Sequence, residues 1–270
     1  MALRDRYRTA LVTGAASGLG AAFVEMLLVE GLTVWGTSRT ITRVPDRAGF
    51  HGLALELANP DSVRDAWTAA ERESGGVDLL INNAGEGIFA SVSELPESAC
   101  AQQIDVLLRG PIQLSRLALS AMTGRGRGGI VNVTSLACEF PIPYLATYSA
   151  AKAGLAALTA ALHLECVGGP LQIVDFRPGD YRTRFNEAMT APQPEGDARA
   201  RAVWRRLEHL LRAAPPPERA ACDLRRALQR GRSGVVRSGT FFQARLAPFL
   251  QRFASQRLSR WVQRRYFELS

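Results

Sequence analysis

The sequence predicts an α/β fold in which helices cover both faces of a parallel sheet. Two observations support this prediction. Short, continuously apolar runs such as VDLLINNAG (77–85) and GGIVNVTS (128–135) are typical of strands that are buried on both faces. These runs alternate with longer segments of helical character, which is the pattern of a βαβ chain. A length of 270 residues with 47% hydrophobic and 21% charged residues suits one large domain of this kind.

The chain begins with a βαβ unit that could hold a phosphate group. Residues 8–14 (RTALVTG) are predicted as a strand, and the turn after it carries Gly14, Gly18 and Gly20 before a helix begins. The backbone N–H groups and the positive end of the helix dipole at such a turn fit a pyrophosphate. Residues 32–39 (LTVWGTSR) are predicted as the second strand, which completes a doubly wound, Rossmann-type unit of suitable length.

The end of the second predicted strand indicates which dinucleotide binds. In NAD-binding units an acidic residue at this place accepts a hydrogen bond from the 2′-hydroxyl of the ribose. This chain has Ser38 and Arg39 there, with Arg43 close behind. A guanidinium can bind a phosphate through two parallel hydrogen bonds. The sequence therefore favours NADP(H) over NAD(H), and the alternative is a surface arginine that follows a strand.

Further strands and helices follow in the alternating order. A strand is expected to end at ALEL (54–57), before a helix over residues 59–73 with Asp61 as its N-cap. Residues 98–122 predict a long helix that is apolar on one side. Residues 171–185 (LQIVDFRPGDYRTRF) give the last clear strand and a turn.

Tyr148 and Lys152 are the strongest candidates for catalysis. Lys152 is the only lysine among the 33 basic residues, and it follows Tyr148 by four positions in a segment that favours a helix. Residues at this spacing share one helical face. A lysine ammonium is compact and its pKa can shift, whereas arginine stays charged. A neighbouring ammonium lowers the pKa of a tyrosine from its usual value of about 10. We therefore expect Tyr148 to act as a general acid/base that Lys152 tunes.

With these motifs in order, the chain resembles the short-chain dehydrogenase/reductase family from about residue 8 to 185. The matching motifs are TGAASGLG, NNAG at 82–85, Ser135, Tyr148-x-x-x-Lys152 and a PGxxxT form that ends at Thr183. The resemblance implies that Ser135 polarises the substrate oxygen and that Lys152 also holds the nicotinamide ribose. Without its spacing to Tyr148, Ser135 would be an ordinary hydroxyl at the end of a strand.

The resemblance also implies a function and a set of cofactor contacts. The function is NADP(H)-dependent interconversion of a ketone and a secondary alcohol on a mostly apolar substrate, with hydroxysteroid and retinol dehydrogenases as similar members. Tyr181 could equally be a packing aromatic, since it is bulkier than the small aliphatic residue often found there. The expected contacts are Thr13, Gly14, Ser17, Gly18, Leu19 and Gly20 at the phosphates, Ser38 and Arg39 at the ribose phosphate, Glu56 and Leu57 at adenine, Asn83, Ala84 and Gly85 along the adenine-side ribose, Tyr148 and Lys152 at the nicotinamide ribose, and Pro178, Gly179, Tyr181 and Thr183 near the carboxamide.

Leu107 departs from the pattern of the family. The family usually has an active-site Asn three residues before a Gly on the helix that precedes the serine strand. Alignment on Gly110 and Pro111 puts Leu107 at that place. The proton relay that this Asn supports through a water molecule is therefore in question, and a binding protein that holds NADP(H) without turnover, as a sensor or interaction protein, is the alternative function.

The C-terminal third carries the basic character of the chain. Residues 1–185 have a net charge of −2 and residues 186–270 one of +10. Within one domain of residues 1–270, residues 186–238 are expected to form a variable, helical substrate lid. This segment contains two Pro-rich breaks, APQP and APPP, around an Arg-rich helix. The amphipathic segment 239–270 could close the active site, pack on a partner subunit or lie on a membrane surface, in that order of expectation. A solvated Arg-rich surface is the simplest reading of the charge.

The composition excludes several other classes of protein. The four cysteines and three histidines show no metal-ligand spacing, so we expect a reducing compartment and no metal. No signal peptide and no membrane span are expected, which predicts a cytoplasmic location. No nucleic-acid-binding motif is present, so a basic membrane- or nucleic-acid-associated protein would depend on the C-terminal charge alone. A homodimer or homotetramer is expected from the resemblance.

Overall fold

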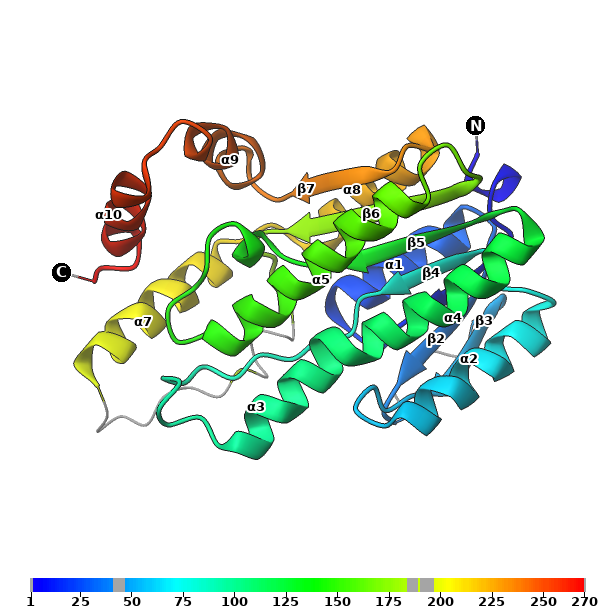
Figure 1. Cartoon of the computed structure of the whole chain (residues 1–270), viewed down its shortest axis with the longest axis horizontal. Helices are drawn as coiled ribbons and strands as arrows, with labels where there is room; N and C mark the ends of the chain where they lie inside the picture. The colour runs from blue at the N-terminus through cyan, green and yellow to red at the C-terminus, as the bar shows by residue number, and fades with distance from the viewer. Residues whose placement is uncertain (1, 41–46, 184–188, 190–196, 270) are drawn as a thin grey trace.

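Seven parallel strands form one sheet at the centre of the molecule, in the order β3-β2-β1-β4-β5-β6-β7 (Figure 1). The computed structural model describes residues 2–40, 47–183, 189 and 197–269. The order of the strands reverses at β1, which β2 and β4 flank. The strands are β1 Thr9–Val12, β2 Thr33–Ser38, β3 Phe50–Ala54, β4 Leu79–Asn82, β5 Gly128–Val133, β6 Leu171–Pro178 and β7 Gly234–Ser238.

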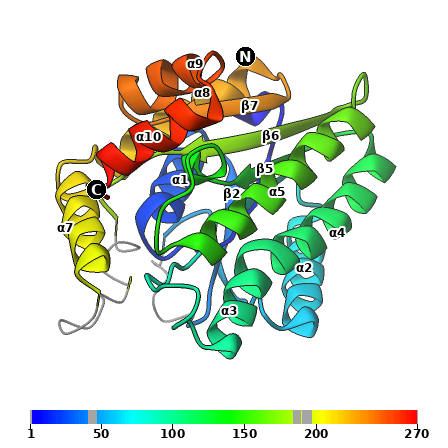
Figure 2. The same cartoon turned by 60° about the vertical axis from the view of Figure 1, so that its left-hand side comes forward.

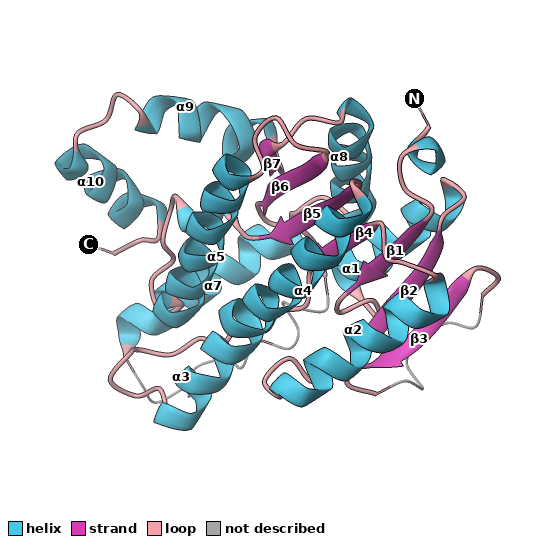
Figure 3. Cartoon of the chain, turned by 45° about the vertical axis from the view of Figure 1, so that its right-hand side comes forward, coloured by secondary structure: helices cyan, strands magenta, loops and turns pink. Residues whose placement is uncertain are grey.

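Helices cover both faces of this sheet, as Figures 1 and 3 show. Helices α1 and α8 pack on one face, and α2, α4 and α5 pack on the other. Strand β1 illustrates how the sequence directs this, since Ala10 and Val12 face the first layer and Leu11 faces the second. The expected doubly wound fold is confirmed. The helices are α1 Gly18–Val29, α2 Pro60–Ser74, α3 Glu97–Ile104, α4 Gly110–Arg125, α5 Ala146–Glu165, α7 Ala198–Arg212, α8 Pro217–Arg230, α9 Ala247–Gln251 and α10 Gln256–Tyr266.

Two local predictions around α2 are wrong. The strand before it ends at Ala54 rather than at residue 57, because the chain turns away after Leu55 donates its backbone N–H to Ser38 O. The N-cap of α2 is Asn59, not Asp61. The Asn59 side chain accepts hydrogen bonds from the backbone N–H groups of Asp61 and Ser62, and Pro60 then occupies the first helical position, where its missing N–H costs nothing.

The predicted lid over residues 186–238 is much smaller in the structure. Helix α8 packs against α1, and β7 pairs with β6, so residues 217–238 belong to the central fold. Strand β7 was missed because GVVRS lies at the edge of the sheet, is only partly buried and gives no continuous apolar run. Helix α7 is the described part of the expected lid, and the APQP break lies outside the described residues.

The long helix predicted over residues 98–122 is continuous but irregular. A π-helical turn, Asp105–Arg109, joins α3 to α4. Such turns are rare and occur frequently at functional sites. Leu107 lies in the middle of this turn and is fully buried.

The C-terminal segment forms two short helices. A π-helical turn at Phe242–Leu246 leads into α9, and the chain breaks before α10. Figures 1 and 2 place α9 and α10 outside the sheet, beyond the C-terminal end of β7. The four cysteines are free thiols, and among the described residues no helix is long and apolar enough to cross a membrane.

Candidate active site

Ser135, Tyr148 and Lys152 lie together beyond the C-terminal end of β5. Ser135 lies two residues beyond the end of this strand, and Tyr148 and Lys152 share one face of α5. A hydrogen bond joins Tyr148 to Ser135. The Lys152 ammonium is 6.0 Å from the centroid of the Tyr148 ring, and Lys152 Nζ donates to Val133 O at 2.7 Å. The structure therefore brings the three predicted residues into one cluster.

Burial controls the pKa values of Tyr148 and Lys152. It raises the pKa of Tyr148 to about 12, and the hydrogen bond with Ser135 only partly opposes this. Burial also lowers the pKa of Lys152 from 10.5 to about 8, because the charged ammonium loses water. We expected the ammonium to lower the pKa of Tyr148, but burial of Tyr148 shifts its pKa in the opposite direction. At pH 7 Tyr148 is therefore a neutral phenol that can donate a proton.

The glycine turn between β1 and α1 leaves room for a phosphate group. Gly14 and Gly18 have φ of +67° and +56°, which favour glycine. A Cβ on Gly20 would lie 2.1 Å from Gly14 O, so only glycine allows the helix to approach the turn this closely. Ser17 is the N-cap of α1 but its side chain makes no capping hydrogen bond, so first-turn N–H groups remain available to an anion. The turn fits a dinucleotide pyrophosphate.

Thr13 and Asn83 hold this turn against the end of β4. The Thr13 hydroxyl accepts the backbone N–H groups of Asn83 and Ala84, both at 2.9 Å. The Asn83 side chain donates to Thr13 O at 2.9 Å. These two predicted cofactor residues therefore use their polar groups to position the crevice wall, and Gly85 continues this wall toward Lys152.

The residues expected at the adenosine end of a dinucleotide lie where β2, β3 and β4 end. Ser38 ends β2, and Arg39 follows it with its guanidinium 3.8 Å from the Glu86 carboxylate. Glu56 follows the end of β3 and is partly exposed, whereas Leu57 is 6% exposed and packs in the core. Arg43 lies outside the described residues.

The segment after β6 reaches back to the glycine turn. A Cβ on Gly18 would lie 3.2 Å from Thr183 Cβ, so Thr183 lies over the start of α1. Gly179 N donates to Ser238 O at 2.7 Å, which fixes the turn that follows Pro178. Tyr181 is buried in the core and its hydroxyl lies 2.6 Å from Ser238 Oγ, so it packs as an aromatic residue.

Leu107 points toward the same site as Lys152. A Cβ on Gly85 would lie 3.1 Å from Leu107 Cδ2 and 3.9 Å from Lys152 Nζ. The chain thus keeps an irregular helix at this place but presents an apolar side chain. The alignment on Gly110 and Pro111 singled out this position from the sequence, and the structure places the Leu107 side chain close to Lys152.

Three polar residues near this cluster were missed by sequence reasoning. Asp180 is a mostly buried carboxyl that accepts a hydrogen bond from Gln243 Nε2 at 2.6 Å, and burial raises its pKa. The negative charge of Asp180 adds to the rise in the pKa of Tyr148. Cys138 Sγ donates to Lys152 O at 3.2 Å. Asp180 stands inside the PGxxxT form and could have been found there, whereas Gln243 stands in no motif.

A cluster of apolar side chains, which we call the apolar wall, lies beside Tyr148. It is separate from the apolar cores on the two faces of the sheet, and it joins α7, the loops before α3 and α5 and the C-terminal residues. Phe89 stacks on Tyr144 with ring centroids 5.2 Å apart. The wall consists of Phe89, Ile142, Tyr144, Leu145, Tyr148, Met189, Ala200, Val203, Trp204, Leu207, Leu211, Tyr266, Phe267 and Leu269.

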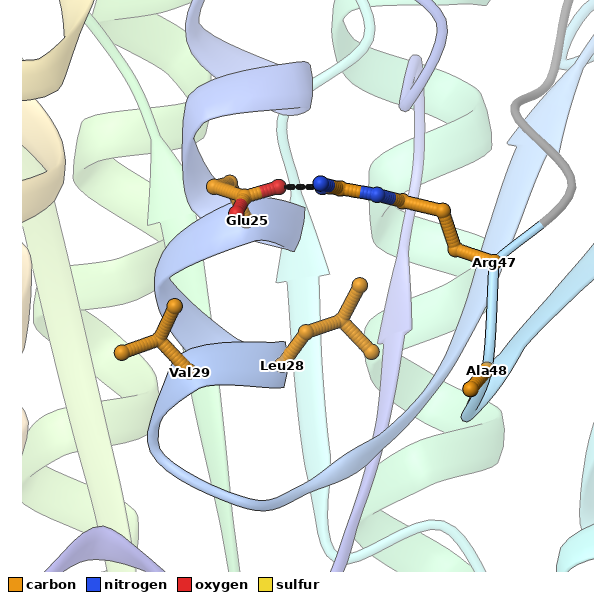
Figure 4. A pocket seen from close by; sticks show the side chains of 5 residues that line it. All are labelled: Glu25, Leu28, Val29, Arg47 and Ala48. Carbon is orange, nitrogen blue, oxygen red and sulfur yellow. Dashed lines mark hydrogen bonds and ion pairs between the residues drawn. The ribbon is translucent and has the colours of Figure 1, made fainter.

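A separate hollow lies at the opposite edge of the sheet. Figure 4 shows Arg47 reaching across to Glu25 above Leu28 and Val29. These residues belong to the C-terminal half of α1 and to the chain just before β3, so they are remote from the glycine turn at the other end of α1. Among the described residues no group of histidine, cysteine and carboxylate side chains could hold a metal ion.

Comparison with known proteins gives consistent matches. The family model described as short chain dehydrogenase matches residues 8–194. A 3-ketodihydrosphingosine reductase of Bacteroides thetaiotaomicron is 29% identical over 241 residues, which cover 89% of this chain and 88% of that protein. A 3-oxoacyl-acyl-carrier-protein reductase of Vibrio cholerae is 31% identical over 191 residues, 69% of this chain and 78% of that protein. A solved short-chain dehydrogenase from Streptomyces avermitilis has a TM-score of 0.79 at 26% identity and covers 92% of this chain and 93% of its own.

Proposed function

Since the chain belongs to the short-chain dehydrogenase family, we propose that it is an NADP(H)-dependent oxidoreductase that interconverts a ketone and a secondary alcohol on a mostly apolar substrate. One observation supports this above the others. Ser135, Tyr148 and Lys152 gather at the same edge of the sheet as the glycine turn. Ligands bind at this edge in open α/β sheets.

The residues of the crevice divide the binding of the cofactor among them. The first turn of α1 and the glycine turn would hold the pyrophosphate, and Arg39 would hold the 2′-phosphate that distinguishes NADP(H). Lys152 would hold the nicotinamide ribose once it exchanges its bond to Val133 O. The bound nicotinamide supplies or accepts the hydride.

Proton transfer in the reduction falls to Tyr148. The Ser135 hydroxyl would donate a hydrogen bond to the ketone oxygen and keep it next to the phenol. Tyr148 is neutral at pH 7 and would give its proton to this oxygen as negative charge develops on it. The Lys152 ammonium, which is mostly charged at pH 7, would stabilise the phenolate that remains.

The apolar wall supports a substrate with a large apolar part. Tyr148 itself belongs to this cluster, so a ketone that reaches its hydroxyl lies against the side chains of α7 and of the C-terminal residues. One similar protein is a 3-ketodihydrosphingosine reductase, whose name indicates a ketone on a lipid. We therefore place medium- and long-chain aliphatic ketones first among candidate substrates.

The test is NADPH oxidation by the purified full chain with a panel of aliphatic, sterol-like, aromatic and polar ketones. Tyr148→Phe should lower kcat by about 10² to 10⁴-fold, since general acid/base catalysis contributes that much. Tyr144→Phe is a matched control, because Tyr144 belongs to the same wall but its hydroxyl donates a hydrogen bond to Asp197. Its kcat should stay within about threefold, as expected for a surface change. Tight NADPH binding without turnover of any ketone would refute the enzymatic function and favour a sensor or interaction protein that only binds NADP(H).

A further inference from the structure

Exposed apolar side chains gather on the C-terminal arm, which we define as residues 241–269. Phe253 is 77% exposed, Phe241 66% and Trp261 59%. Large apolar side chains on soluble monomers are usually scattered singly, and a contiguous group marks an interaction site. The nine exposed members on the arm are Phe241, Phe242, Leu246, Phe249, Leu250, Phe253, Leu258, Trp261 and Val262.

Helical spacing brings these side chains onto common faces. Phe242, Leu246, Phe249 and Phe253 follow one another at steps of four, three and four residues along the first helical stretch. The rings of Phe249 and Phe253 are in contact, with centroids 5.4 Å apart. Leu258, Trp261 and Val262 share one side of α10. Each helix of the arm is therefore amphipathic.

The arm is also strongly basic. It carries six exposed arginines, and Glu268 is the only acidic residue of the arm. None of the six forms an ion pair with any described residue. They are Arg245, Arg252, Arg257, Arg260, Arg264 and Arg265.

Polar contacts and the apolar residues at its end attach the arm to the body, while the nine exposed side chains face solvent. Gln243 donates to Asp180, and Gln251 donates to Glu139 O at 3.0 Å. Arg206 on α7 donates to Tyr266 O at 3.2 Å and lies over its ring. Figures 1 and 2 show α9 and α10 together at the end of the molecule where the strands end. The arm is thus fixed at the same edge as the candidate active site.

We propose that the C-terminal arm is a docking surface for membranes that contain anionic lipids. Helices with arginine on one side and Trp, Phe and Leu on the other lie in the plane of a membrane interface, with the apolar side among the acyl chains. Anionic headgroups complement the six exposed arginines of the arm. A second copy of this chain fits the charge less well, because pairing the arms would bring like charges together. Docking would also bring Tyr266 and Phe267 of the apolar wall to the lipid.

The test is co-sedimentation of the full chain with vesicles of phosphatidylcholine alone or mixed with phosphatidylglycerol. We expect binding to the mixed vesicles that weakens as salt rises, because salt screens the arginines. Arg257→Gln with Arg260→Gln should weaken binding about 30-fold, since each basic residue near an anionic surface contributes about a fivefold factor. Arg64→Gln with Arg72→Gln on α2 removes the same charge elsewhere and should change little.

Apolar variants test the other side of the arm. Phe249→Ser with Trp261→Ser should weaken vesicle binding about tenfold or more, whereas Val29→Ser with Leu164→Ser, which are also exposed, should not. Circular dichroism and NADPH binding check that each variant folds. Equal binding to neutral vesicles, or arm variants that bind like the wild type, would overturn the proposal. So would a wild-type dimer in sedimentation equilibrium that Phe249→Ser with Trp261→Ser makes monomeric. Ketone turnover plays no part in this readout, so it fails or succeeds independently of the proposed function.

Discussion

Removal of Arg39 should shift the choice between NADPH and NADH. Arg39 follows the end of β2, and its guanidinium is 3.8 Å from Glu86 on the chain after β4. These two strands flank β1, so the pair spans the proposed adenosine site. A 2′-phosphate would bind Arg39 in place of Glu86, and Glu86 would then repel this phosphate.

The size of the effect follows from the exposure of the two side chains. A hydrogen bond to a charged group contributes about 1.5 to 3 kcal/mol. The Arg39 side chain is 66% exposed, so water screens it and the lower end applies. Arg39→Ala should therefore lower the ratio of kcat/KM for NADPH to that for NADH by about tenfold. Glu86→Gln should raise the same ratio by about 1.4- to fivefold, since exposed charge pairs contribute about 0.2 to 1 kcal/mol.

The assay is the initial rate of NADPH and of NADH oxidation at a fixed ketone concentration, with each cofactor varied through its KM. Arg47→Ala is the matched control, because it removes an arginine that pairs with Glu25 at the opposite edge of the sheet. It should leave the ratio unchanged. A ratio that stays within twofold of the wild type in Arg39→Ala, or that falls in Glu86→Gln, would refute the assignment of Arg39 to the 2′-phosphate.

Three further outcomes follow from the catalytic cluster. First, kcat/KM for NADPH should fall as pH rises through about 8, because the free enzyme then loses the Lys152 ammonium while Tyr148 stays protonated up to about 12; a profile that rises from pH 7 to 9 contradicts this. Second, Lys152→Arg should lower kcat more than about 100-fold while NADPH still binds, because the wider guanidinium does not fit a site that is 4% exposed; retention of half the kcat would exclude tuning by Lys152. Third, Leu107→Asn should lower the free energy of unfolding by about 1 to 3 kcal/mol, because it buries an amide beside Lys152. It should also raise kcat or reduce the solvent isotope effect on kcat if proton supply limits the rate. Thermal unfolding that shows no loss of stability would contradict the burial of the Leu107 side chain beside Lys152.

Local patterns predicted that Ser135, Tyr148 and Lys152 lie together. Tyr148 and Lys152 are four residues apart on one helix, so their proximity follows from helical geometry alone. Ser135 joins them because the residues just beyond the C-terminal end of a parallel strand lie at the same edge of the sheet. The glycine turn was equally local, since Gly14, Gly18 and Gly20 meet within a few residues. Patterns of this kind need no knowledge of the rest of the fold.

Long-range contacts could not be predicted in the same way. The hydrogen bond between Asp180 and Gln243 joins residues 63 positions apart, and neither side chain has a periodic pattern that indicates its partner. Strand β7 escaped because an edge strand is covered on fewer sides and does not need a continuous apolar run. The sequence showed the amphipathic pattern of the arm. It could not show that the apolar side chains of the arm are exposed, because the same spacing suits a helix that packs on the body.

The pKa of Tyr148 bears on the direction in which the proposed reaction runs. Oxidation of an alcohol needs a phenolate to accept the proton, and a pKa of about 12 leaves almost none at pH 7. A unit charge at about 4 Å in an effective dielectric of about 20 contributes about 4 kcal/mol, or about three pKa units. The Lys152 ammonium, now 6.0 Å from the ring centroid, would therefore leave Tyr148 mostly protonated at neutral pH even if it moved closer. We accordingly expect ketone reduction to dominate at pH 7 and alcohol oxidation to become measurable only as the pH rises.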